Sequence, residues 1–270
     1  MEKIVIIGSD SYIATGLVNH LKNCKTDKLY FNNWSENIDL LQQTDCVINF
    51  SIAPDFSTRK IEPEDVLDVQ IAKHLRSSQT RYIFISSRKV YGTCDNVLIH
   101  KETDALCGWD IYSQNKIKTE QALTDILKNR LTVLRIPNVI GEPVKRAGYK
   151  TFIGWICESF LKDGKLTVTQ NADAVKDFIT KDFLHKNIAE LIYLNKTGVY
   201  NVSAGFGTAV RDVLTGYVGI ENVDFRGQDL PLRDQFILDN SKLTNVTGCQ
   251  ITSNHISQYL ELCRSQMLSQ

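Results

Sequence analysis

The sequence predicts an α/β fold: a Rossmann-type, doubly wound parallel sheet with a smaller C-terminal substrate-binding lobe. Short apolar runs alternate with helix-like segments through the first half of the chain, as in βαβ units. Runs such as Tyr82–Ile85 lack polar alternation, which is typical of strands covered on both faces. The first run ends at Gly8, where such sheets bind ligands. A length of 270 residues suits one large unit with a small lobe.

The elements of the first half follow one another in a regular order. Each predicted strand is a compact apolar run, and a segment with helical periodicity follows most of them. Pro63 suits the first turn of the second helix, because proline lacks the N–H that a first turn leaves unpaired. The predicted strands are Lys3–Ile7, Lys28–Phe31, Cys46–Ser51, Arg81–Ser86 and Leu131–Ile136, and the helices are a stretch to about Lys22, Glu64–Ser77 and Ile111–Asn129.

Beyond Pro137 the elements are more widely spaced. A loop at Gly141–Gly148 carries a proline and three charges, and a helix at Asp182–Leu194, a strand at Gly198–Val202 and a helix at Ser253–Ser265 follow. We therefore expect residues 1–142 to form a dinucleotide-binding domain, to which 176–202 return. Residues 143–175 and 203–270 are expected to form the lobe.

Composition excludes several classes of protein. The chain is 43% hydrophobic and 23% charged, with 31 basic and 31 acidic residues, so nothing indicates a nucleic-acid partner. No apolar run approaches the roughly 18 residues of a membrane span, and the N-terminal run is too short for a signal peptide. We expect a cytoplasmic protein.

The cysteines and histidines show no ligand pattern. Seven cysteines are scattered without a CxxC spacing, and no two of the five histidines have metal-ligand spacing. Buried free thiols in a reducing compartment are the expected state, and we predict no metal.

The loop after the first strand is an eroded phosphate-binding loop. Residues 8–14 read Gly-Ser-Asp-Ser-Tyr-Ile-Ala, so only Gly8 of a G-x-x-G-x-x-G pattern remains. Ser11 places a side chain where backbone would approach a pyrophosphate, although its hydroxyl can bind a phosphate. Ala14 is small enough for close packing between helix and strand.

The end of the second strand favours NADP(H). Asn32 and Asn33 stand where NAD-binding enzymes usually place a carboxylate for the ribose hydroxyls. Asparagine does not repel a 2′-phosphate, but no arginine follows, so NAD(H) is not excluded. Simple turn residues are the competing interpretation.

Tyr112 lies four residues ahead of Lys116. On a helix this spacing stacks both side chains on one face. An ammonium beside a phenol favours the phenolate and lowers its pKa, which suits proton transfer near neutral pH. An exposed Tyr/Lys pair on a helix has the same spacing, so the match requires context.

The wider order of motifs resembles the extended short-chain dehydrogenase/reductase family, which contains nucleotide-sugar epimerases, dehydratases and reductases. The resemblance covers nearly the whole chain. Its segments are Asp45–Ser51, Ile83–Gly92, Glu102, Tyr112–Lys116, Leu134–Gly141, Lys176–Phe178, Gly198–Val202, Arg226–Asp229 and Asp239–Lys242.

The resemblance implies roles for individual residues. It makes Ser87 the hydroxyl that binds the substrate oxygen, Tyr112 the general acid/base and Lys116 the residue that holds the nicotinamide ribose. Gly8, Ser11, Tyr12, Ile13, Asn32, Ser51 and Lys116 would bind the cofactor. Asn138 and Arg226 would contact the nucleotide phosphates, Asp229 the nucleoside, and Lys176 replaces a usual arginine.

At two positions the sequence departs from the family's pattern, and these departures disfavour two of the family's reactions. Family dehydratases carry an Asp-Glu pair after the hydroxyl residue, and the GDP-fucose epimerase-reductases carry a cysteine two residues after it. Arg88 and Lys89 stand there instead. We therefore expect an NADPH-dependent reductase of a nucleotide-diphosphate-linked 4-keto-6-deoxy sugar, of the type that supplies O-antigen-type surface polysaccharides.

Two alternatives stay open. One is a nucleotide-hexose 4-epimerase with tightly bound NAD, although the eroded loop and the absent carboxylate disfavour it. The other is a non-catalytic dinucleotide sensor, for which the eroded loop is the only support. Family members often dimerise through two long helices, which makes Ile111–Asn129 the candidate dimer helix.

Overall fold

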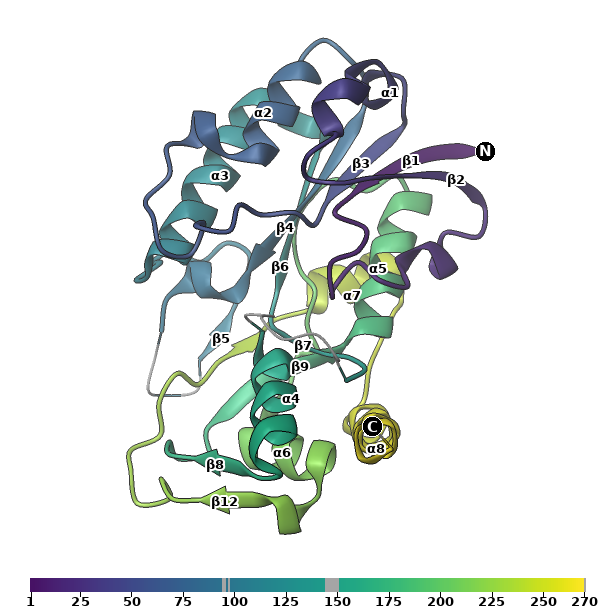
Figure 1. The fold of residues 1–270 in the computed structure, drawn as a ribbon. Helices are drawn as coiled ribbons and strands as arrows, with labels where there is room; N and C mark the ends of the chain where they lie inside the picture. Colours follow the sequence, from purple (N-terminus) through teal and green to yellow (C-terminus); the bar gives the residue numbers. More distant parts are fainter. Residues whose placement is uncertain (94–95, 97, 144–150, 270) are drawn as a thin grey trace.

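A six-stranded parallel sheet forms the centre of the molecule (Figure 1). The computed structural model describes residues 1–93, 96, 98–143 and 151–269. The sheet order is β10-β6-β4-β3-β1-β2, so the order reverses beside β1. The predicted doubly wound α/β fold is confirmed. The strands are β1 (Glu2–Ile7), β2 (Cys24–Leu29), β3 (Cys46–Asn49), β4 (Arg81–Ser87), β6 (Leu131–Ile136) and β10 (Gly198–Asn201).

Each face of the sheet has its own core. Successive side chains of a strand point to opposite faces, so Val5 and Ile7 join one cluster while Ile4 and Ile6 join the other. The first cluster packs under α1 (Ile38–Gln42), α2 (Leu67–His74) and α3 (Ile111–Leu127). The second packs against α5 (Lys181–Tyr193). Burial on both faces explains why these strands read as unbroken apolar runs.

The prediction of an α-helix between β1 and β2 is wrong. Turns occupy residues 8–16, and a 3₁₀ helix, η1 (Leu17–His20), follows. Gly16 adopts φ +98°, a left-handed conformation that a continuing α-helix does not permit. The Thr15 hydroxyl also donates to Ser11 O at 2.9 Å, and such local bonds compete with helix formation. β2 starts and ends earlier than the predicted Lys28–Phe31.

The other elements of this half match their predicted positions closely. β6 has the predicted bounds, and α3 starts at the predicted Ile111. α2 is shorter than Glu64–Ser77, because Pro63 opens the 3₁₀ helix η3 (Pro63–Asp65) and Val66 is extended. The 3₁₀ helices η2 (Trp34–Asn37), η4 (Arg88–Tyr91) and η5 (Lys128–Arg130) complete this half.

Small sheets and helices lie beyond the carboxyl edge of the main sheet (Figure 1). Of these, only α8 (Ser253–Leu268) was predicted, as Ser253–Ser265. The predicted loop Gly141–Gly148 lies mostly outside the described residues. The division into domains stays a prediction. The remaining elements are β5 (Ile99–His100), β7 (Asn138–Ile140), β8 (Leu166–Val168), β9 (Val175–Thr180), β11 (Gly207–Ala209), β12 (Val223–Phe225), β13 (Ile237–Leu238), α4 (Phe152–Asp163), α6 (Val210–Val218), α7 (Ser241–Thr247) and η6 (Ile220–Asn222).

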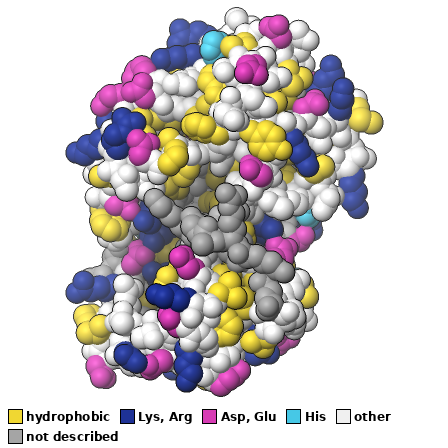
Figure 2. Space-filling model, viewed as in Figure 1, with side chains coloured by type: hydrophobic (Ala, Val, Ile, Leu, Met, Phe, Trp, Pro, Cys, Tyr) yellow, Lys and Arg dark blue, Asp and Glu magenta, His cyan; other side chains and the backbone are white. Residues whose placement is uncertain are grey.

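The surface carries charges of both signs. On the face in Figure 2, Lys and Arg side chains are interspersed with Asp and Glu. Across the described residues, no helix combines the length and apolarity that crossing a bilayer requires.

Candidate active site

A pocket of about 670 Å³ opens at the carboxyl ends of β1, β3, β4 and β6. This is the edge at which open α/β sheets bind their ligands. Eight of the predicted site residues line it, together with the unpredicted Asn49 and Asp68. Those eight are Ser11, Tyr12, Ile13, Ser51, Ser87, Tyr112, Lys116 and Asn138.

The end of β4 and the start of α3 bring Ser87 to Tyr112. Asp110 caps α3, and its carboxylate accepts the Ser113 N–H at 2.7 Å, which fixes the first turn that carries Tyr112. The Ser87 hydroxyl lies close enough to the Tyr112 phenol to lower its pKa, and it accepts the Lys89 N–H at 3.2 Å. A serine that accepts a backbone N–H can still donate its own proton.

The pKa of Tyr112 is raised, to about 12. Burial is the largest cause of the rise, and the Ser87 hydroxyl opposes it. The prediction that Lys116 lowers this pKa is wrong for this structure. The Lys116 ammonium donates to Ile85 O at 2.7 Å and lies 5.8 Å from the centroid of the Tyr112 ring. Tyr112 therefore carries its proton at neutral pH.

Lys116 is itself deeply buried, with 4% of its surface exposed. Its ammonium lies 4.5 Å from the Phe84 ring centroid and 5.2 Å from that of Phe56. The preceding residue, Asn115, fixes the segment that carries Phe56, because its amide donates to Phe56 O at 2.8 Å. Burial lowers the pKa of Lys116, and Asp68 is the largest opposing influence.

The turn after β1 forms the other end of the pocket. Gly8 has φ +72°, and a Cβ at this position would lie 2.8 Å from Ser51 N. Only glycine fits this close approach. The Ser11 hydroxyl accepts the Ala14 N–H at 3.3 Å and keeps its own hydrogen for a ligand.

This end of the pocket fits a dinucleotide. A glycine without space for a side chain and an adjacent hydroxyl suit a pyrophosphate. No group of three or more His, Cys, Asp or Glu residues in the described chain could hold a metal ion.

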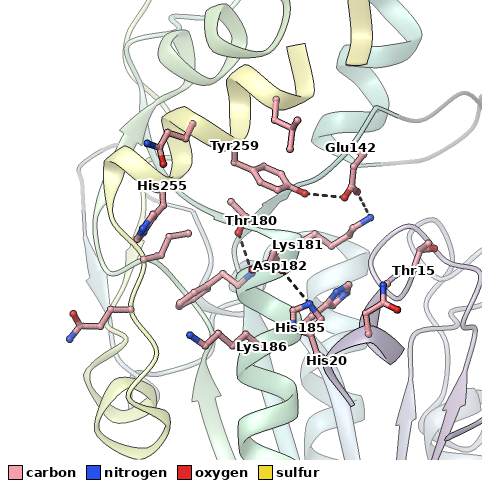
Figure 3. Close-up of a pocket in the computed structure, with 17 residues that line it drawn as sticks. Thr15, His20, Glu142, Thr180, Lys181, Asp182, His185, Lys186, His255 and Tyr259 are labelled. Atoms are coloured by element: carbon pink, nitrogen blue, oxygen red, sulfur yellow. Dashed lines mark hydrogen bonds and ion pairs between the residues drawn. The ribbon is translucent and has the colours of Figure 1, made fainter. Parts of the chain in front are cut away.

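A second hollow, of about 580 Å³, lies behind the same turn (Figure 3). The structure places His185 of α5 there with 2% of its surface exposed. Its Nε2 lies 2.7 Å from Ile13 O, and because a carbonyl only accepts, Nε2 carries the proton. His20 packs edge-on against His185 and lies 3.3 Å from Asp182. His185 therefore holds the turn from behind.

The two residues after Ser87 are bound in ion pairs. Arg88 makes a bidentate pair with Asp234, with both contacts at 2.6 Å, and stacks over Phe236. Lys89 lines the pocket, and its ammonium lies 2.7 Å from Asp110. Neither position offers a carboxylate to a substrate beside Ser87.

Five predicted site residues are absent from the lining of this pocket: Gly8, whose turn is described above, and four others. Lys176 pairs with Asp234 at 2.9 Å, and Arg88 binds the same carboxylate. Arg226 is exposed and pairs with Asp224 at 2.7 Å. Asp229 and Asn32 are exposed. Their roles stay predictions.

Sequence reasoning missed Asp68 and His185. Asp68 carried a signal, because a carboxylate between Leu67 and Val69 interrupts an apolar helix face, and buried carboxylates are rare unless paired. His185 carried none, since its partner is 172 residues away.

The chain matches the model of one known protein family. A model described as the NAD dependent epimerase/dehydratase family matches residues 3–194, which is more than two thirds of the chain. No curated protein matches.

Solved structures share the fold at low sequence identity. TunA, an NAD-dependent NDP-hexosamine 5,6-dehydratase of tunicamycin biosynthesis, has a TM-score of 0.79 at 17% identity, covering 100% of this chain and 99% of its own. The UDP-N-acetylglucosamine 4-epimerase of Methanobrevibacter ruminantium M1 has 0.78 at 17%, covering 99% and 98%. RMD of Pseudomonas aeruginosa, complexed with NADPH, has 0.73 at 20%, covering all of both chains.

Proposed function

Because the chain belongs to the NAD dependent epimerase/dehydratase family, we propose that it is an NADPH-dependent reductase of a nucleotide-diphosphate-linked 4-keto-6-deoxy sugar. The similar structures include an NDP-hexosamine 5,6-dehydratase, a UDP-N-acetylglucosamine 4-epimerase and a protein complexed with NADPH, which supports this substrate class and a nicotinamide cofactor. Surface polysaccharide synthesis is the expected use of the product.

One observation carries the choice of reaction. The Ser87–Tyr112 hydroxyl pair stands in the pocket while the next two positions hold Arg88 and Lys89, each engaged by an aspartate. Elimination of water from a sugar needs a further acid and base at that place, whereas reduction of a carbonyl needs one proton donor. A phenol with its pKa raised to about 12 holds that proton at neutral pH.

Each residue of the pocket would have its own role in the reduction of a carbonyl. The nicotinamide, when bound, supplies the hydride to the carbonyl carbon. Ser87 donates a hydrogen bond to the carbonyl oxygen, and Tyr112 gives that oxygen its proton as negative charge develops there. Lys116 would hold the ribose. Asn138, which lines the same pocket, would bind the nucleotide phosphates.

An absorbance assay tests the proposal. NADPH should be consumed in proportion to an added nucleotide-linked 4-keto-6-deoxy sugar, and NADH should support slower turnover. Unchanged turnover in Tyr112→Phe would refute the assigned proton donor.

A 4-epimerase is the second candidate, and several similar structures are named 4-epimerases. Such an enzyme first oxidises its substrate and reuses the same NAD. Purified protein that releases NAD on denaturation, and interconverts nucleotide hexoses without added cofactor, would establish this alternative. Dinucleotide binding without turnover of any sugar would instead indicate a sensor.

A further inference from the structure

Asp68 is a buried carboxylate on the floor of the pocket. It lies near the start of α2, with 3% of its surface exposed, among lining residues that include Lys116. Its Oδ1 accepts two hydrogen bonds, from Asn49 Nδ2 at 2.9 Å and from Tyr82 Oη at 2.8 Å. Both donors are neutral, so they orient the carboxylate without neutralising its charge.

Lys116 is a buried ammonium that needs a counter-charge. Burying an unpaired charge is costly, and a buried lysine loses its proton unless an anion lies nearby. Two carboxylates act on Lys116, first Asp68 and then Glu120. Its one hydrogen bond in the described chain goes to a neutral acceptor, Ile85 O.

Glu120 is already committed elsewhere. Its two carboxylate oxygens bind Arg135 at 2.7 and 3.2 Å, and Ser86 donates to it as well. Its charge is therefore offset by the guanidinium. Within the described residues, no ion pair engages Asp68.

Lys89, which also lines the pocket, is paired with Asp110, and three further titratable groups nearby are neutral at working pH. Tyr82 on β4 has its pKa raised by burial, and burial likewise raises that of Cys46 on β3. Tyr112 on α3 also stays protonated. Burial also raises the pKa of Asp68, and Lys116 is the largest influence that opposes this rise. Asp68 and Lys116 line the same pocket, and each favours the charged form of the other.

We propose that Asp68 is the counter-charge of Lys116: it keeps the ammonium protonated inside the pocket and so acts as a positioning residue for the chemistry at Tyr112. This rests on the proposed function and deepens it, because Lys116 is the residue assigned there to the ribose. The acid lies on α2, one helix away from the Tyr112/Lys116 turn, and Tyr82 and Asn49 hold it in place.

The test compares Asp68→Asn with Tyr82→Phe. Asp68→Asn removes the charge but keeps an oxygen that accepts from Tyr82 and Asn49. Tyr82→Phe removes one of these hydrogen bonds and keeps the charge. Lysine labelled with ¹³C at Cε reports the protonation of Lys116 during a pH titration by NMR, with Lys116→Arg assigning the signal.

The midpoint of the Lys116 titration should fall to lower pH in Asp68→Asn and stay in place in Tyr82→Phe. Turnover of Asp68→Asn, measured above neutral pH, should drop about tenfold, as expected when the ammonium loses its proton one pH unit earlier. Its alkaline limb should move with the NMR midpoint.

Three outcomes would overturn the proposal. They are an unchanged midpoint in Asp68→Asn, an equal fall in both variants, and a midpoint that moves while the alkaline limb of turnover does not. If the protein reduces no sugar, the NMR midpoints still decide whether Asp68 is the counter-charge. Failure of the proposed function is thereby separated from failure of this inference.

Discussion

The two ends of the pocket are built in different ways. At the Tyr112 end, the functional side chains lie at the end of a strand and in the first turns of a capped 17-residue helix. At the Gly8 end, turns and a 3₁₀ helix stand where a helix was predicted, and a histidine from α5 holds the backbone. Side-chain chemistry at a fixed helical spacing can be predicted from sequence. A backbone conformation held by a distant residue cannot.

The sharpest way to separate the two ends is to remove the Tyr112 hydroxyl. Tyr112→Phe should lower turnover at least about 100-fold, because general acid catalysis contributes roughly that much or more. NADPH binding should change little, since the cofactor turn is untouched. Fluorescence titration with NADPH beside the turnover assay checks both. A parallel loss of binding and turnover would show that the two ends are not separable.

A substitution at Gly8 should damage the other end. Gly8→Ala forces a side chain into a left-handed conformation and against Ser51. We expect a loss of about 2 kcal/mol in unfolding free energy and weaker NADPH binding. Denaturant unfolding and fluorescence titration measure the two effects. Gly164→Ala is the matched control, because Gly164 also has positive φ but a Cβ there meets nothing within 4 Å.

Replacing His185 tests whether the turn depends on α5. His185→Leu leaves the Ile13 carbonyl buried without its donor, at a cost on the order of 1–3 kcal/mol. NADPH affinity should fall about tenfold, which corresponds to about 1.4 kcal/mol. His185→Gln, which can still donate, should recover most of it. His20→Gln serves as the control in the same hollow (Figure 3), and an equal loss there would contradict a specific role for His185.

The sequence predicted the sheet well because its strands are buried on both faces, so each reads as a bounded apolar run. The sequence also predicted that Ser87, Tyr112 and Lys116 lie close together. The carboxyl ends of parallel strands meet at one edge of the sheet, and side chains four residues apart on a helix share one face. The prediction failed at residues 9–22, where Gly16 and side-chain bonds override helical periodicity. The small sheets outside the main sheet were poorly predicted, since their strands are mostly three residues long or shorter and pair with distant partners.

The smallest predicted effect concerns the pH dependence of the ion pairs that Asp234 makes with Arg88 and Lys176. Burial opposes ionisation of Asp234, but Arg88 and Lys176 outweigh it and hold the pKa of this carboxyl below its ordinary value. Its contribution to stability is thus complete above the unfolded-state pKa, near 3.9, and is lost as pH falls through the lower folded-state pKa. Asp234→Asn should cost about 1 kcal/mol at pH 7.

Thermal melts across pH measure this contribution. The difference between parent and Asp234→Asn should shrink as the solution becomes strongly acidic. A constant difference would assign the effect to packing rather than to charge. Asp55→Asn, which removes an exposed pair with Arg59, controls for general acid sensitivity.

The position of β10 in the sheet bears on how the chain folds during synthesis. β10 pairs with β6 from Gly198↔Thr132 to Asn201↔Arg135. β6 therefore pairs on one side with β4, but it gains β10 on its other side only after about 200 residues have been synthesised. Until then β6 presents an open, apolar edge, the kind that pairs with other chains. A nascent chain of this protein should therefore need protection from aggregation until β10 leaves the ribosome.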